Sequence, residues 1–226
     1  MKTLDGFFEE NDFSYLKLND QPLENQYDAL WRDIYKPSQD KKIIENNVDE
    51  DTKNAAFNGL SKRGKFLCQI YDYFGCKNVA EVGTAEGYQF FTFCDFISRN
   101  NRRHKVFTCD IRDVRNTKYT GQYPGIEQFT LGQSKELAEE IIKQEEKIDL
   151  YWIDGAHHGG SVLTDVIRLA KTQSKNCVWI FDDFNERFGI YNEINFLSSF
   201  NESRTLSLGP VASGKPNNML IVRGRF

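Results

Sequence analysis

Residues 79–88, with the sequence VAEVGTAEGY, place a short apolar stretch directly before a turn that contains two glycines. The stretch 79–82 has the length and composition of a buried strand, and a helical pattern of apolar residues begins at Tyr88. Because Gly83 and Gly87 have no side chains, the backbone N–H groups of the turn can approach a ligand closely. The segment therefore predicts a strand, a tight turn and a helix that together hold a nucleotide-like ligand.

Acidic residues lie at the end of this strand and of three further predicted strands. Glu81 is in the first strand, and Asp110, Asp154 and the pair Asp182 and Asp183 follow the apolar segments that begin at residues 106, 150 and 178. Ligands of open α/β sheets bind at the carboxyl ends of the strands. These acidic residues are therefore candidates for binding or catalysis.

The rest of the chain alternates between strand-like and helix-like segments. The expected strands are 79–82, 105–109, 126–131, 148–153 and 177–181, and the expected helices are 51–74, 88–99, 134–143, 161–171 and 188–200. This alternation predicts an α/β domain with a parallel sheet and helices on both faces. Residues 205–208 and 219–223 break the alternation and predict a C-terminal antiparallel hairpin.

Residues 1–50 are polar and rich in Asn, Asp and Glu, with scattered aromatic residues and one short amphipathic helix expected at 27–35. We expect an N-terminal helical appendage to a domain that spans residues 51–226. Two roles stay open for it. The appendage either packs on the domain or on a second subunit of a homo-oligomer, which we favour, or it forms a lid over the substrate.

Composition excludes several classes of protein. The 226 residues carry a net charge of −4 with acids and bases interspersed, which gives no basic surface for a nucleic acid. No apolar run approaches the roughly 20 residues of a membrane helix, and the N-terminal sequence has no apolar core typical of a signal peptide. We therefore expect a cytoplasmic protein with no nucleic-acid or membrane partner.

The five cysteines, an odd number without a C-x-x-C pair, are expected to be buried reduced thiols.

A parallel sheet that ends in an antiparallel hairpin, with the first turn EVGTAEG, resembles the class I S-adenosylmethionine-dependent methyltransferases. The resemblance covers residues 55–226 and implies a Rossmann-like fold with a mostly parallel seven-stranded sheet. A nicotinamide dehydrogenase would instead have the pattern G-x-G-x-x-G, but Gly83 and Gly87 lie four residues apart. A carboxylate at Glu81 also favours a ligand with an ammonium and a sulfonium group over a pyrophosphate.

The resemblance implies which residues bind S-adenosylmethionine. Asp110 would accept hydrogen bonds from the ribose hydroxyls, and Gln133 and Ser134 would flank the adenine. Other readings stay open: Asp110 can be a helix-capping or loop carboxylate, and Ser134 a plain N-cap. Residues assigned to the methionine part are Glu81, Gly83, Thr84 and Gly87, with Asp154 beside them.

The segment 148–165, IDLYWIDGAHHGGSVLTD, and the segment 181–184, FDDF, resemble the metal-dependent O-methyltransferase branch that includes methyltransferase family 24 and macrolide sugar methyltransferases. The resemblance implies that Asp154, Asp182 and Asp183 hold one divalent cation. Their carboxylate oxygens suit Mg²⁺. His157 would be the general base, since its ordinary pKa lies near neutrality. Alternatively, the two adjacent acids cap a helix or face solvent, and His157 has a structural role in its loop.

Three hypotheses about function follow. The leading one is a magnesium-dependent O-methyltransferase that acts on a hydroxyl of a small-molecule acceptor such as a sugar or a natural-product glycoside. The second is a metal-independent N-methyltransferase of the same fold. The third is a cofactor-binding subunit without turnover.

Asp165, in the helix predicted after the histidines, either orients the histidine loop or is an exposed helical acid.

Overall fold

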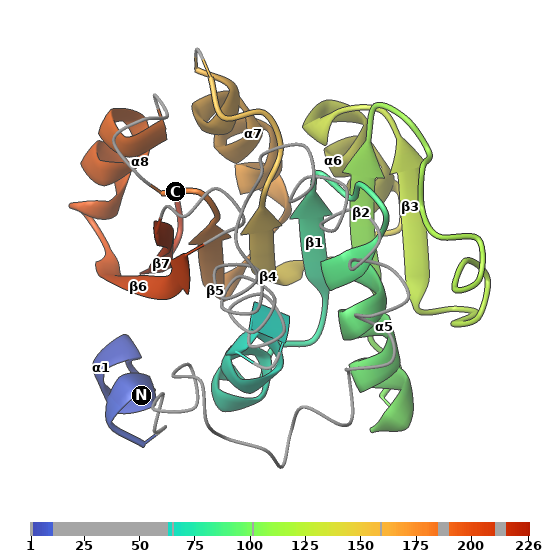
Figure 1. Cartoon of the computed structure of the whole chain (residues 1–226), viewed down its shortest axis with the longest axis horizontal. Coiled ribbons are helices and arrows are strands. Elements are labelled where there is room, and N and C mark those ends of the chain that lie inside the picture. The colour runs from blue at the N-terminus through green and yellow to red at the C-terminus, as the bar shows by residue number, and fades with distance from the viewer. Residues whose placement is uncertain are drawn as a thin grey trace.

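The computed structural model describes residues 2–10, 63–64, 66–100, 102–158, 160–184, 190–210 and 216–226. In this part of the chain, seven strands form one sheet with the order β3-β2-β1-β4-β5-β7-β6 (Figure 1). Strands β1 to β5 are parallel, and β7 is antiparallel to both β5 and β6. The predicted mostly parallel sheet with a C-terminal antiparallel hairpin is confirmed. The strands are Val79–Val82 (β1), Val106–Asp110 (β2), Glu127–Leu131 (β3), Ile148–Ile153 (β4), Gln173–Phe181 (β5), Glu202–Pro210 (β6) and Pro216–Arg223 (β7).

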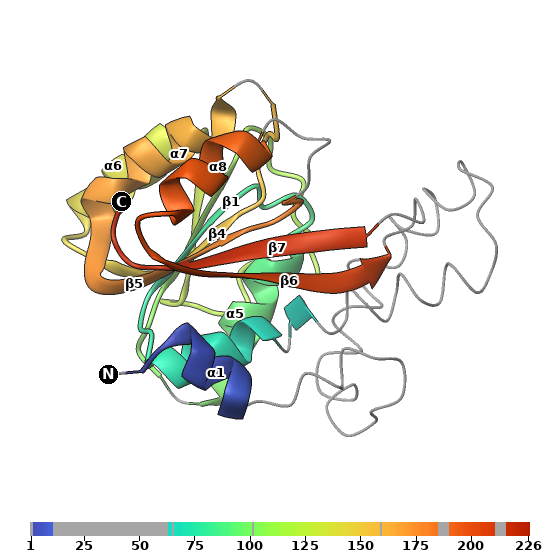
Figure 2. The ribbon, with the colours of Figure 1, turned by 90° about the vertical axis from the view of Figure 1, so that its left-hand side faces the viewer.

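Helices cover both faces of the sheet, as predicted (Figure 2). On one face lie α1 (Leu4–Glu10), the helical residues 66–74 and α5 (Tyr88–Arg99). On the other face lie α6 (Ser134–Lys143), α7 (Ser161–Leu169) and α8 (Ile190–Ser198), and α7 continues into the 3₁₀ turn η2 (Ala170–Thr172). Each face therefore has its own apolar core.

The strand β4 shows how the sequence supplies both cores. Successive side chains of a strand point to opposite faces, so Leu150 and Trp152 join the core under α5, whereas Tyr151 and Ile153 join the core under α6 and α7. The Tyr151 ring stacks on Trp179 of β5 with a centroid separation of 3.7 Å. Because β4 is buried on both faces, it fixes the position of the residues that follow it.

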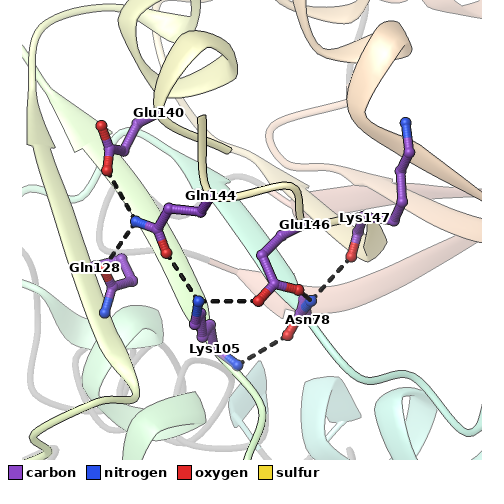
Figure 3. A network of polar contacts seen from close by, with 7 residues as sticks. All are labelled: Asn78, Lys105, Gln128, Glu140, Gln144, Glu146 and Lys147. Carbon is purple, nitrogen blue, oxygen red and sulfur yellow. Dashed lines mark hydrogen bonds and ion pairs between the residues drawn. The ribbon is translucent and has the colours of Figure 1, made fainter. Parts of the chain in front are cut away.

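A polar network fixes the opposite, amino-terminal ends of the strands (Figure 3). Asn78 accepts a hydrogen bond from the backbone N–H of Lys105 at 3.0 Å and donates one to Glu146 at 2.8 Å. Lys105 Nζ lies 2.9 Å from Glu146 Oε1 and donates to Gln144, which in turn donates to Gln128. These contacts join the starts of β1, β2 and β4, and so align their carboxyl ends.

Several predicted boundaries differ from the structure. The helix expected at 161–171 ends at Leu169, and β5 begins at Gln173 instead of residue 177. The early start depends on contacts with distant parts of the chain, because Gln173 pairs with Ile148 and its side-chain amide donates to the backbone carbonyl of Phe226. The hairpin strands are also longer than predicted, since the pairing of β6 with β7 already begins at Glu202.

The first described residues of the N-terminal appendage pack on the domain. Leu4 and Phe7 of α1 are fully buried, and the Phe7 ring contacts Phe66 at 6.0 Å and Tyr73 at 5.2 Å between centroids. The helix expected at 27–35 and most of the segment 1–50 lie outside the described residues. The helix expected at 51–74 is confirmed for residues 66–74, and it stops at Gly75, whose φ is +66°.

All five cysteines are buried and unlinked by disulfides, as predicted. No helix in the described ranges combines the length and the apolar character that are needed to cross a bilayer.

Candidate active site

A cleft with a volume of about 670 Å³ opens at the carboxyl ends of the parallel strands. Its walls come from the residues that follow β1, β2, β3 and β4 and from one face of α7. This size suits a nucleoside-like small molecule. Five of the residues predicted to bind the cofactor line the cleft, namely Gly83, Asp110, Gln133, Ser134 and Asp154.

The turn after β1 needs its first glycine for two reasons. Gly83 has φ +93°, and a Cβ atom at this position would lie 2.2 Å from the backbone carbonyl oxygen of Asp154. The N–H of Gly83 also donates to the carbonyl of Cys109 at 3.0 Å. The turn therefore lies directly against the end of β4. Gly87, with φ +91°, precedes α5, and a Cβ there would meet the Phe91 ring at 2.4 Å.

Glu81 lies beneath the cleft and not in its lining. It pairs with Thr108 in the neighbouring strand, and the Thr108 hydroxyl donates to Glu81 Oε2 at 2.6 Å. The Thr84 hydroxyl contacts Thr108 Oγ1 at 2.6 Å, so Thr84 is buried in the same group. Burial raises the pKa of Glu81 to about 8. Burial therefore favours the protonated form of Glu81 in the protein without a ligand, and its predicted role beside a cationic ligand stays a prediction.

Asp110 connects the end of β2 to the glycine turn. Its Oδ2 accepts a hydrogen bond from the N–H of Ala85 at 2.9 Å, and its Oδ1 accepts one from the N–H of Arg112 at 3.2 Å. Each carboxylate oxygen has lone pairs left for a second donor. Asp110 can thus hold the turn in place and still accept hydrogen bonds from a ligand in the cleft.

The residues after β3 differ from one expectation. Ser134 is not the N-cap of α6, because that position is taken by Gln133, whose N–H donates to Glu136 Oε2 at 2.9 Å. Ser134 is the first residue of the helix, and its hydroxyl donates to Asp165 Oδ1 at 2.5 Å. The alternative of an exposed Asp165 is wrong, since only 8% of this residue is exposed.

The predicted acidic residues lie together beyond the ends of β4 and β5. His157 lies between two of them, with Nε2 3.7 Å from Asp154 Oδ1 and Nδ1 3.4 Å from Asp183 Oδ2. Asp182 forms an ion pair with Arg63, in which Arg63 Nη1 lies 2.9 Å from Asp182 Oδ2. Both side chains are buried. The Arg63 guanidinium also lies 5.3 Å from the centre of the Trp152 ring. We call Asp154, His157, Asp182 and Asp183 the acidic cluster.

The acidic cluster carries more negative charge than its neighbours neutralise. Burial raises the pKa of Asp154 well above its usual range, and repulsion from Asp182 adds to this shift. Burial also raises the pKa of Asp182, although the Arg63 charge opposes the shift. Asp182 Oδ1 is buried with no hydrogen-bond partner in the described part of the chain. Such carboxylates must take up a proton or bind a cation.

Other residues near the site have structural roles. Tyr151 and Trp152 are fully buried core residues. Phe184, which follows the acidic pair, is buried, and its ring stacks on Tyr191 with 4.9 Å between the ring centroids. His158 lines the cleft, and its N–H donates to Ser161 Oγ.

Sequence reasoning missed Arg63 and Arg168. Arg63 precedes the helical residues 66–74, and no local pattern connects it to Asp182, which lies far away in the sequence. Arg168 lines the cleft and donates to Gln133 Oε1 at 3.1 Å. Ser161, Asp165 and Arg168 are spaced so that they lie on one face of a helix, and this spacing is the sequence signal by which Arg168 could have been found.

The strand order, the antiparallel last strand and the cleft at the carboxyl ends define the class I methyltransferase fold. Residues 80–184 match the family described as a methyltransferase domain, methyltransferase family 24. This match includes the strands that carry the cleft, and the protein is an S-adenosylmethionine-dependent methyltransferase. The resemblance inferred from the sequence is confirmed.

Solved structures agree with this fold. An O-methyltransferase from Bacillus cereus, solved with S-adenosylhomocysteine (SAH), has a TM-score of 0.55 at 16% identity, with 88% of this chain and 96% of that chain covered. The O-methyltransferase TomG from Streptomyces achromogenes, involved in tomaymycin synthesis and solved with S-adenosylmethionine, has a TM-score of 0.56 at 10% identity, with 91% and 100% covered. No curated protein matches the chain significantly by sequence.

Proposed function

We propose that the protein is an O-methyltransferase that transfers the methyl group of S-adenosylmethionine to a hydroxyl of a small polar acceptor, such as a sugar or a natural-product glycoside. The observation that carries the proposal is the position of Asp154, which lines the cofactor cleft and also belongs to the acidic cluster. An acceptor at the cluster would thus lie beside the methyl donor. Both similar structures named above are O-methyltransferases, which supports the same acceptor atom.

His157 is the proposed general base. A proton on Nδ1 points toward Asp183 Oδ2, which leaves the lone pair of Nε2 on the side of Asp154. In this tautomer, Nε2 takes the proton of the acceptor hydroxyl while the oxygen attacks the methyl carbon. Asp110 would hold the ribose, and the glycine turn would hold the methionine part. Fixing both reactants in this way supplies much of the rate enhancement of a single displacement.

The donor set of the acidic cluster fits a divalent cation. Three ionised carboxylates and one guanidinium leave a charge of −2, and the buried Asp182 Oδ1 has no partner among the described residues. We propose that Asp154, Asp182 and Asp183 bind Mg²⁺ or another divalent cation through hard oxygen ligands. Such a cation lowers the pKa of a bound hydroxyl. Among the residues described, however, no three or more His, Cys, Asp or Glu side chains form a preassembled metal site.

A specific contact favours a second candidate, a metal-independent methyltransferase of the same fold. Arg63 already neutralises part of the Asp182 charge at 2.9 Å. With protons on the remaining carboxylates, the cluster needs no further cation and can bind an amine acceptor directly. The acceptor atom then is nitrogen, and the reaction is insensitive to chelators.

Methyl transfer by metal-stripped protein separates the two candidates. The assay uses S-adenosylmethionine with a panel of hydroxylated sugars, glycosides and phenols and a matched panel of amines. We expect transfer to a hydroxyl compound that depends on Mg²⁺ and stops with EDTA. In the His157→Gln variant, the rate with saturating Mg²⁺ should fall by about 10²–10⁴-fold, the usual contribution of a general base.

The matched variant His158→Gln changes the neighbouring histidine and should lose much less activity. EDTA-resistant methylation of an amine would favour the second candidate. A full rate in His157→Gln would exclude the proposed base.

The roles of residues 1–50 as a lid or a homo-oligomer contact stay predictions, which sedimentation of the full chain at several concentrations can test.

A further inference from the structure

A buried positive charge is in contact with the acidic cluster. Arg63 Nη1 lies 2.9 Å from Asp182 Oδ2, and both side chains are almost fully buried. The Arg63 guanidinium also lies 5.3 Å from the centre of the Trp152 ring, which is itself fully buried and adds a cation–π contact. These two contacts fix the positive charge inside the protein, so the guanidinium cannot turn away into solvent.

The two oxygens of Asp182 have different surroundings. Oδ2 forms the ion pair with Arg63, whereas Oδ1 is buried without a hydrogen-bond partner among the described residues. The backbone of Asp182 is held in place, because its N–H donates to the carbonyl of Ile153 at the end of β4 at 3.0 Å. A cation bound at Oδ1 would therefore share one carboxylate with the Arg63 guanidinium.

Arg63 changes the charge that the acidic cluster presents to a cation. The three ionised carboxylates have a charge of −3, which the guanidinium reduces to −2. The affinity of a carboxylate site for a divalent cation depends on the number of charged ligands. Two positive charges that share a buried carboxylate also repel each other more strongly than in water, because the effective dielectric constant is lower. Arg63 should thus weaken the binding of a cation and stabilise the cluster when no cation is bound.

We propose that Arg63 lowers the affinity of the acidic cluster for a divalent cation, so that the cluster is stable without the cation and binds it weakly and reversibly. The inference rests on the proposed function, because it needs the cation at Asp154, Asp182 and Asp183. A purely structural role of Arg63 has the opposite consequence. If Arg63 only held Asp182 in position, its replacement would disturb a ligand and weaken the binding of the cation.

The test measures Mg²⁺ binding to the metal-stripped protein by calorimetry. Arg63→Gln removes the charge and keeps a side-chain amide that can donate to Asp182. We expect this variant to bind Mg²⁺ about 10- to 100-fold more tightly than the wild-type protein, which is a typical strength of coupling between two sites. Arg63→Lys keeps a positive charge and should stay close to the wild-type affinity.

Arg102→Gln is the matched control for the loss of one positive charge. Arg102 pairs with Asp72 at 2.7 Å and precedes β2, so it lies at the opposite end of the strands from the acidic cluster. The affinity of this variant for Mg²⁺ should equal that of the wild-type protein. A gain in affinity that Arg102→Gln shares would be an effect of net charge alone and would contradict the specific role of Arg63.

Chemical denaturation with and without Mg²⁺ is a second measurement, which also serves if Arg63→Gln is unstable without the cation. Mg²⁺ should raise the unfolding midpoint more in Arg63→Gln than in the wild-type protein, because a ligand of the folded state stabilises it according to its affinity. Equal or weaker Mg²⁺ binding by Arg63→Gln would overturn the inference, as would a variant that stays unfolded at high Mg²⁺. Absence of Mg²⁺ binding in the wild-type protein and in both Arg63 variants would contradict the proposed cation site itself.

Discussion

Replacing Gly83 with alanine is expected to destabilise the domain by about 2–5 kcal/mol and to abolish tight binding of SAH. The positive φ of Gly83 strains any residue with a Cβ by about 1–2 kcal/mol. The new Cβ would also lie 2.2 Å from the carbonyl oxygen of Asp154. This backbone atom cannot move aside without shifting the end of β4, and overpacking of this kind adds about 1–3 kcal/mol or more.

Gly121→Ala is the matched control for Gly83→Ala. Gly121 has a similar φ of +82°, but an added Cβ would meet nothing within 4 Å. Chemical denaturation of both variants therefore separates backbone strain from the close contact. Equal losses of stability in the two variants would contradict the close approach of the turn to β4.

Replacing Asp182 with alanine is expected to lower the free energy of unfolding by about 3–5 kcal/mol, because the variant leaves a buried guanidinium without its carboxylate. The Arg63 and Asp182 side chains are only 6% and 4% exposed and lie 2.9 Å apart. Denaturation curves at pH 7 measure the loss. The same variant should lose divalent-cation binding if Asp182 is a ligand, as calorimetry with Mg²⁺ can show.

Two further variants sharpen the Asp182 experiment. In the double variant Arg63→Met/Asp182→Leu, both charges are replaced by apolar side chains, so most of the stability should return. Asp183→Ala removes the neighbouring acid, whose side chain is 33% exposed, and should cost much less. If Asp182→Ala unfolds at the same denaturant concentration as the wild-type protein, the buried ion pair does not stabilise the fold.

The sheet and the cleft could be predicted because their signals are local. The stretch 79–82 is apolar and ends in a glycine turn, and the acids of the later strands follow apolar runs of strand length. Parallel strands bring such acids to one edge, so the proximity of Asp154, His157 and Asp183 was also predictable. The early start of β5 was not, because it depends on the contact between Gln173 and the distant Phe226.

The charge state of Glu81 and the partners of Asp182 and Asp165 could not be read from the sequence. Each depends on tertiary packing. Glu81 is desolvated by the sheet, Asp182 meets Arg63 from a separate segment, and Asp165 meets Ser134 across the α6–α7 contact. Such side chains have ordinary neighbours in the sequence, so their burial gives no local pattern. Buried polar contacts therefore changed the interpretation of the site more than the strand and helix boundaries did.

The central claim is that Asp110 and the glycine turn bind the cofactor, and calorimetric titration of metal-stripped protein with SAH tests it most directly. We predict micromolar binding that Asp110→Ala weakens by about 100-fold, the loss expected when hydrogen bonds to a carboxylate are removed. The control Asp113→Ala removes an exposed acid paired with Arg115 and should bind normally. Absence of binding, with or without Mg²⁺, or full affinity in Asp110→Ala would contradict the account.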